Sequence, residues 1–403
     1  MNLPFATDRI PAYGDLRGNQ QMTTSEVDKK QPNIIPQLDG LRAFAALLVV
    51  GSHTGQIGLP LIFPSLTGGF GVLLFFMLSG FLMGYLYLHK PLDAPSVAHY
   101  VAARVARIAP IYLLAVTLAY IASALLGPQF VYYINGRDFL RLLAFSGSSH
   151  IFWSIPPEVQ FYVAFAAFWY AVRRGYAGLA VPAVILLAGV TMLFRPIFPG
   201  ISLPSHFHIF FLGVTLAVMV RSGVTAIISA KIATFIQAVS IIALLIASLR
   251  IWPNKEFIES IGWDDNAVVY GNIGLVICFG AFLLASTVPN RFGSAIFANK
   301  PMRRIGGYSF SLYLLHEPIL AGTGYLTSDL LPGSIVIAIG ISLSLLVAAI
   351  SFHWFERPVQ DALRSPIAKL VYAIIVRVKL ALGWAQPAPA HLVEPAVKVV
   401  STP

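Results

Sequence analysis

The chain has 403 residues, of which 57% are hydrophobic and 11% are charged, whereas about 25% are charged in ordinary soluble domains. This composition excludes an ordinary soluble globular fold and indicates a membrane protein, in which a single helix bundle can hold a chain of this length. The net charge of +10 alone would fit a nucleic-acid-binding protein, and the single cysteine, Cys278, excludes a disulfide framework.

The first 37 residues are polar and include Asp8, Arg9, Glu26 and Asp28. They lack the apolar stretch of a cleaved signal peptide, so we expect the first apolar segment to be retained. We interpret residues 1–37 as a cytoplasmic N-terminal segment.

Ten apolar stretches follow, each near the roughly 20 residues that a helix needs to cross a bilayer. They cover residues 40–60, 68–88, 108–127, 156–173, 177–195, 206–221, 227–249, 267–288, 305–327 and 333–355. The sequence therefore predicts an all-α polytopic membrane bundle of about ten transmembrane helices over residues 38–360. Residues 361–403 are expected to form a cytoplasmic C-terminal tail.

Basic residues gather on one side of these predicted spans. If the N-terminus is cytoplasmic, all but five of the 27 lysines and arginines lie on the cytoplasmic side, the exceptions being Arg137, Arg141, Arg195, Arg250 and Lys255. Such an excess is the positive-inside pattern, and an even number of spans places both termini inside. The positive charge thus orients a multi-pass protein of the inner membrane and attracts anionic lipid, and it does not predict a nucleic-acid partner.

Arg42 and His53 share the first apolar segment and are eleven residues apart. Eleven residues make about three helical turns, so both side chains lie on nearly the same face, ~16 Å apart along the axis. An ionisable residue within the bilayer is costly and is therefore a candidate for function. This geometry suits an anionic cofactor that is held near the arginine while its reactive end reaches the histidine.

Six motifs along the chain resemble those of the acyltransferase family 3 membrane proteins. In order, they are Leu38–His53, Gly69–Leu82, Arg104–Tyr112, Trp153–Tyr162, Tyr308–His316 and Glu356–Pro358. The resemblance covers about residues 36–360, and it implies transfer of acyl groups, often acetyl from acetyl-CoA, onto hydroxyls of sugars and other acceptors. Pro156-Pro157 departs from the usual pair before Glu158, which puts the start of that helix in doubt.

The resemblance implies catalytic roles for His53, Glu158 and His316. A base is needed beside the acceptor hydroxyl, and imidazole is the usual choice near neutral pH. We prefer His53 as a direct base, although a transient acyl carrier and a buried core histidine are alternatives. Packing and an active-site role are both open for His316, which Pro318 places near the outer end of its span. Glu158 would support the histidine or the sugar from the outer side, or only cap a helix.

The resemblance likewise implies that Arg42, Arg104 and Arg107 bind the phosphates of acyl-CoA, for which the arginine fork is well suited. Anchoring at the membrane surface is the alternative. His206 and His208 are two residues apart and would point to different faces of a helix, so they do not predict a metal site. We find no other cluster of metal ligands, and acyl-CoA is the one co-substrate predicted.

The sequence thus predicts an inner-membrane acyltransferase for groups other than aminoacyl groups. It would move an acyl group from acetyl-CoA or another acyl-CoA to a hydroxyl of a carbohydrate or glycolipid, such as a surface or exported polysaccharide. A proton-coupled transporter of a sugar or lipid-linked substrate is the alternative, because intramembrane histidines and glutamates also build proton relays. Transporters often show internal repeats and interrupted helices, which we do not see. A non-catalytic lipid- or sugar-binding component is a third possibility.

Overall fold

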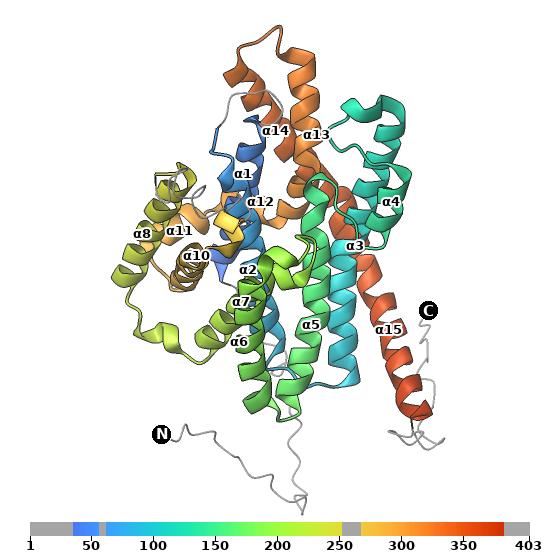
Figure 1. Cartoon of the computed structure of the whole chain (residues 1–403), viewed down its shortest axis with the longest axis vertical. Helices are drawn as coiled ribbons and strands as arrows, with labels where there is room; N and C mark the ends of the chain where they lie inside the picture. The colour runs from blue at the N-terminus through green and yellow to red at the C-terminus, as the bar shows by residue number, and fades with distance from the viewer. Residues whose placement is uncertain (1–34, 56–61, 252–266, 383–403) are drawn as a thin grey trace, which may run out of the picture. The chain divides into compact units, whose positions relative to one another are not determined.

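The computed structural model describes residues 35–55, 62–251 and 267–382. Within these ranges the chain forms α-helices joined by short 3-10 and π segments, with no strand (Figure 1). The predicted all-α membrane bundle is confirmed. Most of the N-terminal segment and the last residues of the C-terminal tail fall outside the described residues.

The α-helices are α1 (Pro36–His53), α2 (Leu66–Tyr87), α3 (Ala94–Leu126), α4 (Gly136–Leu143), α5 (Ile155–Arg173), α6 (Ala177–Leu193), α7 (Phe207–Arg221), α8 (Ala230–Ser248), α10 (Ile273–Ala285), α11 (Arg291–Phe297), α12 (Lys300–Gly307), α13 (Ser309–Thr327), α14 (Gly333–Ser351) and α15 (Arg357–Ala381). The 3-10 segments are η2 (Gly127–Gln129), η3 (His150–Ser154), η4 (Arg195–Ile197), η5 (Leu203–His206) and η6 (Val224–Ile227), and the π segments are η7 (Ala267–Gly271) and η8 (Phe352–Glu356).

Five helical stretches of the described residues are long and apolar enough to cross a membrane. They are Leu66–Tyr87, Ala94–Gln129, Leu203–Arg221, Ala230–Ser248 and Gly333–Ala381. The apolar helices α6 and α10 are shorter, while α1, α5 and α13 carry the charged and imidazole side chains of the site described below. Within the described residues, all ten predicted stretches overlap helices, but their number as membrane spans stays a prediction.

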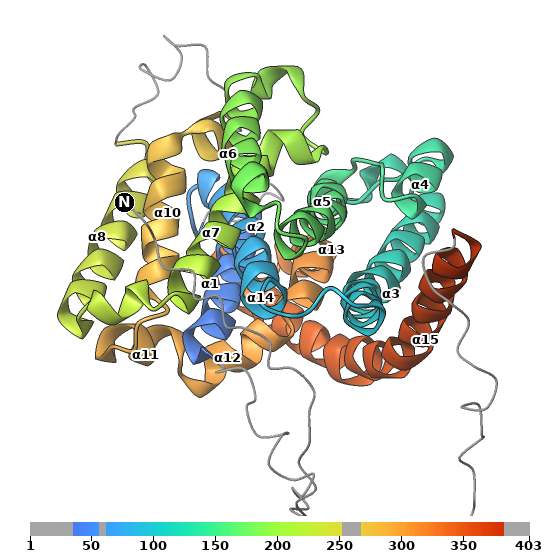
Figure 2. The same cartoon turned by 90° about the horizontal axis from the view of Figure 1, so that it is seen from below.

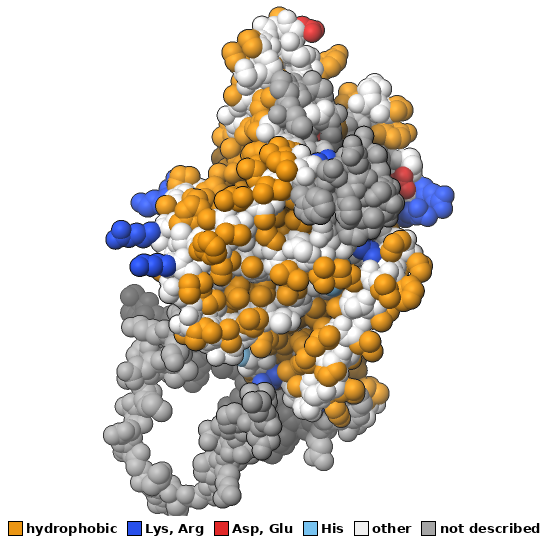
Figure 3. All heavy atoms as spheres, turned by 60° about the vertical axis from the view of Figure 1, so that its left-hand side comes forward, with side chains coloured by type: hydrophobic (Ala, Val, Ile, Leu, Met, Phe, Trp, Pro, Cys, Tyr) orange, Lys and Arg blue, Asp and Glu red, His pale blue; other side chains and the backbone are white. Residues whose placement is uncertain are grey.

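The surface of α8 shows how the sequence adapts a helix to lipid. Its exposed hydrophobic side chains recur every three or four residues along one face: Ile232, Phe235, Val239, Ile242, Leu245 and Leu249. The opposite face buries small and polar residues such as Ala233, Gln237 and Ser240. Figure 3 shows hydrophobic side chains covering much of the molecular face on this side. Such a surface is stable against hydrocarbon and unfavourable in water.

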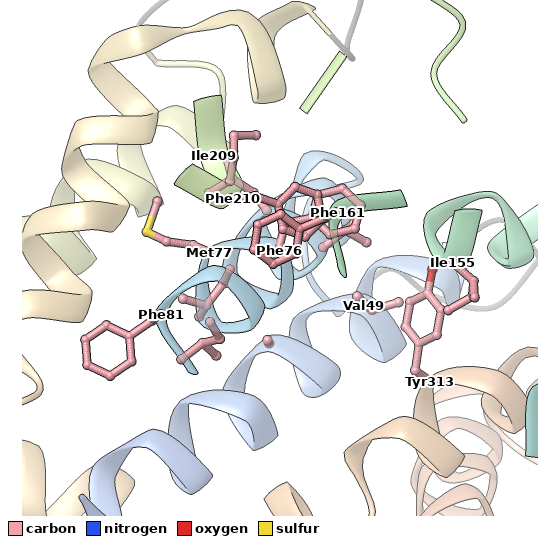
Figure 4. Packing of buried hydrophobic residues seen from close by; sticks show 14 of the residues in the cluster. Val49, Phe76, Met77, Phe81, Ile155, Phe161, Ile209, Phe210 and Tyr313 are labelled. Atoms are coloured by element: carbon pink, nitrogen blue, oxygen red, sulfur yellow. The ribbon is translucent and has the colours of Figure 1, made fainter. Parts of the chain in front are cut away.

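Close packing of α2 against α7 forms the centre of the bundle. Gly80 of α2 faces the carbonyl oxygen of Phe210, and Gly213 of α7 faces that of Met77, so closely that a Cβ at either glycine would collide with backbone. Small residues at such crossings let helix backbones approach within a membrane. Phe210 also stacks on Phe76 and on Phe161 of α5, with ring centroids 4.6 and 4.4 Å apart (Figure 4).

Helix α3 begins at Ala94, well before the predicted start at residue 108. Asp93 caps this end by accepting a hydrogen bond from the backbone N–H of Ser96 at 2.8 Å, and hydrogen bonds from Ser96 lower the pKa of the Asp93 carboxyl. Arg104 and Arg107 therefore lie inside a continuous helix. The predicted apolar stretch 108–127 covers the C-terminal part of α3, because hydropathy detects apolar surface, whereas the helix also includes the charged residues before it.

The predicted span 305–327 is two helices, α12 and α13, which meet at the non-helical residue Tyr308. Helix α13 continues past Pro318 to Thr327, so His316 lies within the helix and not near its end. A proline is tolerated in such a helix because neighbouring groups satisfy the freed carbonyl. Residues up to Ala381 of the predicted tail form α15, which packs along α3 (Figure 2).

Candidate active site

Helix α1 carries Arg42 at one end of the site and His53 at the other. It runs without interruption from Pro36 to His53, so the predicted alignment of Arg42 and His53 on one helix face is present. Arg42 lines a cavity with Arg104 and Arg107, which we call the arginine cavity. His53 lines a different one, the histidine cavity, together with His150 and Glu317. One helix thus connects the predicted donor-binding residues to the predicted base.

His53 and His316 are hydrogen-bonded to each other across α1 and α13. The Nδ1 atom of His53 lies 2.8 Å from Nε2 of His316, and the two rings are stacked with centroids 5.0 Å apart. The structure therefore brings together two of the three predicted catalytic residues, although they are 263 positions apart in the chain.

The surroundings of His316 determine the tautomers of the pair. Its Nδ1 lies 3.1 Å from the carbonyl oxygen of Leu312 and 2.8 Å from that of Tyr313, so Nδ1 carries the proton and donates it. In a neutral imidazole the other nitrogen is then an acceptor. Nε2 of His316 accordingly accepts from Nδ1–H of His53, and this leaves the lone pair of His53 on Nε2.

The Nε2 atom of His53 faces α2. A Cβ built on Gly68 would lie 3.9 Å from this nitrogen, and Gly68 lines the histidine cavity. The same Cβ would collide with Oγ of Ser52, so glycine at this position lets α2 approach α1 beside the histidine. Trp153, Tyr270 and His150 form further parts of the wall, which gives the cavity both aromatic faces and hydrogen-bonding groups.

Glu317 is a residue of the site that the sequence prediction did not include. Its carboxylate oxygen Oε2 lies 3.7 Å from Nδ1 of His53, and its side chain is buried. A carboxylate there stabilises positive charge on His53 once the ring accepts a proton. The signal was available, because an acidic residue inside an apolar span is itself a candidate for function.

The donor atoms of His53, His316 and Glu317 lie within 4.8 Å of one another, a grouping that could hold a metal ion. The sequence did not predict this cluster. Two nitrogens bound to a tetrahedral zinc at the usual distances would be ~3.3 Å apart. The 2.8 Å between Nδ1 of His53 and Nε2 of His316 instead corresponds to a hydrogen bond, so the geometry fits a proton-sharing pair better than a metal site.

Glu158 lies in the arginine cavity, apart from the two histidines. Its carboxylate accepts hydrogen bonds from the hydroxyls of Ser79 and of Tyr162, the latter at 2.6 Å. The chain before α5 explains this position: η3 supplies Ile151 and Trp153 to the histidine cavity, so α5 starts inside the bundle. The expected place of Glu158 beside the reacting histidine does not agree with these contacts.

Arg104 contacts two aromatic rings. Its guanidinium lies 5.7 Å from the ring centre of Tyr162 and 6.0 Å from that of Tyr87. Its Nε atom is buried and has no hydrogen-bond partner among the described residues. A buried donor without a partner is unfavourable, and a bound anion would relieve this cost.

His206 and His208 each form a hydrogen bond with a different backbone carbonyl group. Nε2 of His206 lies 2.9 Å from the carbonyl oxygen of Gly200, and Nε2 of His208 lies 2.8 Å from that of Tyr270. Each ring donates to a different carbonyl. These contacts account for both histidines as parts of the packing around η5 and α7.

The two cavities differ in size and share two lining residues, Val72 and Tyr313, which we call the partition. The arginine cavity measures about 60 Å³ and the histidine cavity about 330 Å³. Groups held in the two cavities would meet at Val72 and Tyr313.

Comparison with known proteins shows the family to which the chain belongs. A family model described as "Acyltransferase domain" matches residues 35–353. The chain belongs to acyltransferase family 3. It resembles O-acetyltransferase OatA of Staphylococcus aureus, at 24% identity over 371 residues in both strain NCTC 8325 / PS 47 and strain COL. The matched part covers 82% of this chain and 58% of those relatives, so the chain spans little more than half their length. No solved structure matches it.

Proposed function

We propose that this protein transfers an acyl group, most simply acetyl, from acyl-CoA to a hydroxyl of a carbohydrate. The observation that carries the proposal is the placement of Arg42 and His53 on one helix, in two cavities that share a partition. Family membership and the likeness to O-acetyltransferases support it. The donor would enter on the arginine side and the acceptor on the histidine side.

On the donor side, Arg42, Arg104 and Arg107 bind the phosphates of acyl-CoA. Guanidinium–phosphate hydrogen bonds are charge-assisted and among the strong ones in proteins. In this proposal the pantetheine arm runs from these arginines toward Val72 and Tyr313, while the nucleotide remains outside the arginine cavity. Glu158 then belongs to the donor side as well, where it fixes the hydroxyls of Ser79 and Tyr162. We therefore assign Glu158 to donor binding and not to proton transfer.

At the partition, the acceptor hydroxyl gives its proton to Nε2 of His53 as its oxygen bonds to the thioester carbon. The carbonyl electron pair moves onto oxygen and then returns, which breaks the carbon–sulfur bond. The CoA thiolate leaves and takes the proton from His53, so the products are the ester and the CoA thiol. His316 holds His53 in the required tautomer, and Glu317 offsets the charge of the imidazolium.

The acceptor is assigned to carbohydrates because of the wall of the histidine cavity. Trp153 and Tyr270 supply aromatic rings to this wall, packed edge-to-face with centroids 5.9 Å apart. Sugar rings present C–H groups to such rings and hydroxyls to neighbouring polar groups. We place the protein in the inner membrane with both termini cytoplasmic, which puts the arginine cavity nearest to cytoplasmic acyl-CoA.

The test is transfer by purified protein in lipid nanodiscs. Acetyl-CoA labelled in the acetyl group is supplied with a surface polysaccharide, and label in the polysaccharide is measured together with the CoA thiol released. We expect equal amounts of both with wild type and neither with His53→Ala. Polysaccharide that stays unlabelled while the acetyl-CoA remains intact would contradict the proposal.

A proton-coupled transporter remains the second candidate, because the cluster of His53, His316 and Glu317 is also a set of titratable groups inside a membrane. The same protein in sealed vesicles distinguishes the two functions. A transporter accumulates the sugar when a proton gradient is imposed and consumes no acyl-CoA. A transferase consumes acyl-CoA without requiring a gradient.

A further inference from the structure

Tyr313 occupies the boundary between the two cavities. It is on α13, one turn before His316, and the ring centroids of these two residues are 6.4 Å apart. Of the described residues, only Val72 and Tyr313 line both cavities, and of these two only Tyr313 is polar. Figure 4 shows its side chain reaching toward Ile155 at the start of α5.

The hydroxyl of Tyr313 is held by η3. It donates to the carbonyl oxygen of Ile151 at 2.8 Å and lies 2.9 Å from the hydroxyl of Ser154. The Ser154 hydroxyl is itself 3.3 Å from the same Ile151 oxygen. The Ser154 hydroxyl can therefore donate to the Ile151 carbonyl oxygen when the Tyr313 hydroxyl turns away. The buried oxygen then still accepts a hydrogen bond.

Acyl transfer requires a hydrogen-bond donor at the boundary between the two cavities. When the acceptor oxygen bonds to the thioester carbon, negative charge develops on the carbonyl oxygen, and a donor aimed at that oxygen lowers the barrier. His53 cannot supply this donor, because its Nε2 is taking the proton of the hydroxyl. The donor must lie where donor and acceptor cavities meet.

We infer that Tyr313 is a catalytic residue whose hydroxyl donates a hydrogen bond to the thioester carbonyl oxygen as negative charge develops there. The inference rests on the proposed function, since it requires an acyl thioester at the partition. The phenolic proton stays on Tyr313 throughout. Bonds form and break only between the acceptor oxygen, the carbonyl carbon, the CoA sulfur and the proton carried by His53.

The decisive variant is Tyr313→Phe, which removes the hydroxyl and keeps the ring. Loss of one such donor typically lowers kcat about 10²- to 10³-fold, and we expect a loss of that size. Binding of S-ethyl-CoA, a thioether that lacks the carbonyl, should be unchanged, because the hydroxyl contacts only the carbonyl oxygen.

Ser154→Ala is the matched control. It removes the hydroxyl that lies 2.9 Å from the Tyr313 hydroxyl but leaves the proposed donor in place, so we expect a smaller loss of transfer than with Tyr313→Phe. If Ser154→Ala lost as much activity as Tyr313→Phe, Tyr313 would only be joining η3 to α13 and the inference would fail. Transfer by Tyr313→Phe within about threefold of wild type would also overturn it.

Two further outcomes need their own interpretation: a Tyr313→Phe variant that does not fold, and a wild-type protein that is inactive. If Tyr313→Phe does not fold, as judged by S-ethyl-CoA binding, 3-fluorotyrosine is incorporated at position 313, which makes the hydroxyl a stronger donor. A changed transfer rate supports the inference, and an unchanged rate overturns it. If wild type itself transfers no acetyl group, the proposed function fails and this inference fails with it; active wild type with active Tyr313→Phe refutes the role of Tyr313 alone.

Discussion

Glutamine substitutions at His53 and His316 should have opposite consequences. Glutamine offers an amide oxygen as a hydrogen-bond acceptor but does not take up a proton near neutral pH. It can therefore replace a residue that orients its neighbour, and it cannot replace a base. Since His316 accepts from Nδ1–H of His53 at 2.8 Å, we expect His316→Gln to retain transfer and His53→Gln to lose it.

The hydrogen-bond geometry sets the size of each effect. His316→Ala leaves the buried N–H of His53 without its acceptor, which costs about 1–3 kcal/mol and corresponds to a loss of about 5- to 150-fold. His316→Gln restores an acceptor, and the remaining loss should stay within about 10-fold. His53→Gln removes the base, whose contribution is typically about 10²- to 10⁴-fold.

The assay is transfer of labelled acetyl groups to the polysaccharide, with acetyl-CoA binding as the control for correct folding. All three variants should bind acetyl-CoA like wild type, because neither histidine lines the arginine cavity. If His316→Gln were as inactive as His53→Gln, His316 itself would transfer the proton. If His53→Gln kept near wild-type activity, His53 would be a buried core histidine that glutamine can replace, and the assignment of the base would be refuted.

Replacement of both Arg104 and Arg107 by alanine should weaken acyl-CoA binding by about 1.5–3 kcal/mol for each lost phosphate contact while membrane insertion is kept; unchanged affinity would return both residues to an anchoring role. The exposed residues Ser148, Ser328 and Ser365 test the orientation. Cysteines at the first two should react with an impermeant thiol reagent from outside intact cells, and labelling at the third would reverse the topology. Chelation by EDTA should leave transfer unchanged, because the two histidines share a proton at 2.8 Å; loss of activity that zinc restores would show a metal in the cluster.

Hydropathy was sufficient to predict where helices occur, because each predicted apolar stretch overlaps at least one helix of the described residues. It could not predict that α3 extends back to Ala94 or that the chain leaves the helical conformation at Tyr308. Those features depend on capping and on contacts between helices. An apolar stretch reports burial in protein or lipid and carries no information about which helices are neighbours.

The same limit applies to the site. Arg42 and His53 could be related from the sequence, because a helix fixes the geometry of residues eleven positions apart. The pairing of His53 with His316 joins residues 263 positions apart, which only the packing of α1 against α13 determines. Glu158 was expected beside the histidine or the sugar, but it contacts Ser79 and Tyr162 in the arginine cavity, a neighbourhood that only the packing of α5 against α2 determines.

Helix α1 explains why one protein needs both cavities. In the proposed function the arginines bind a highly charged donor that cannot enter the bilayer, so this part of the site must stay near water. The base must instead meet the thioester where water is excluded, because water would compete with the acceptor hydroxyl for the acyl group. A continuous helix with arginine and histidine three turns apart satisfies both requirements at a fixed separation. The pantetheine arm of CoA is a slender chain suited to cover that separation, and this gives the ~16 Å between Arg42 and His53 a chemical reason.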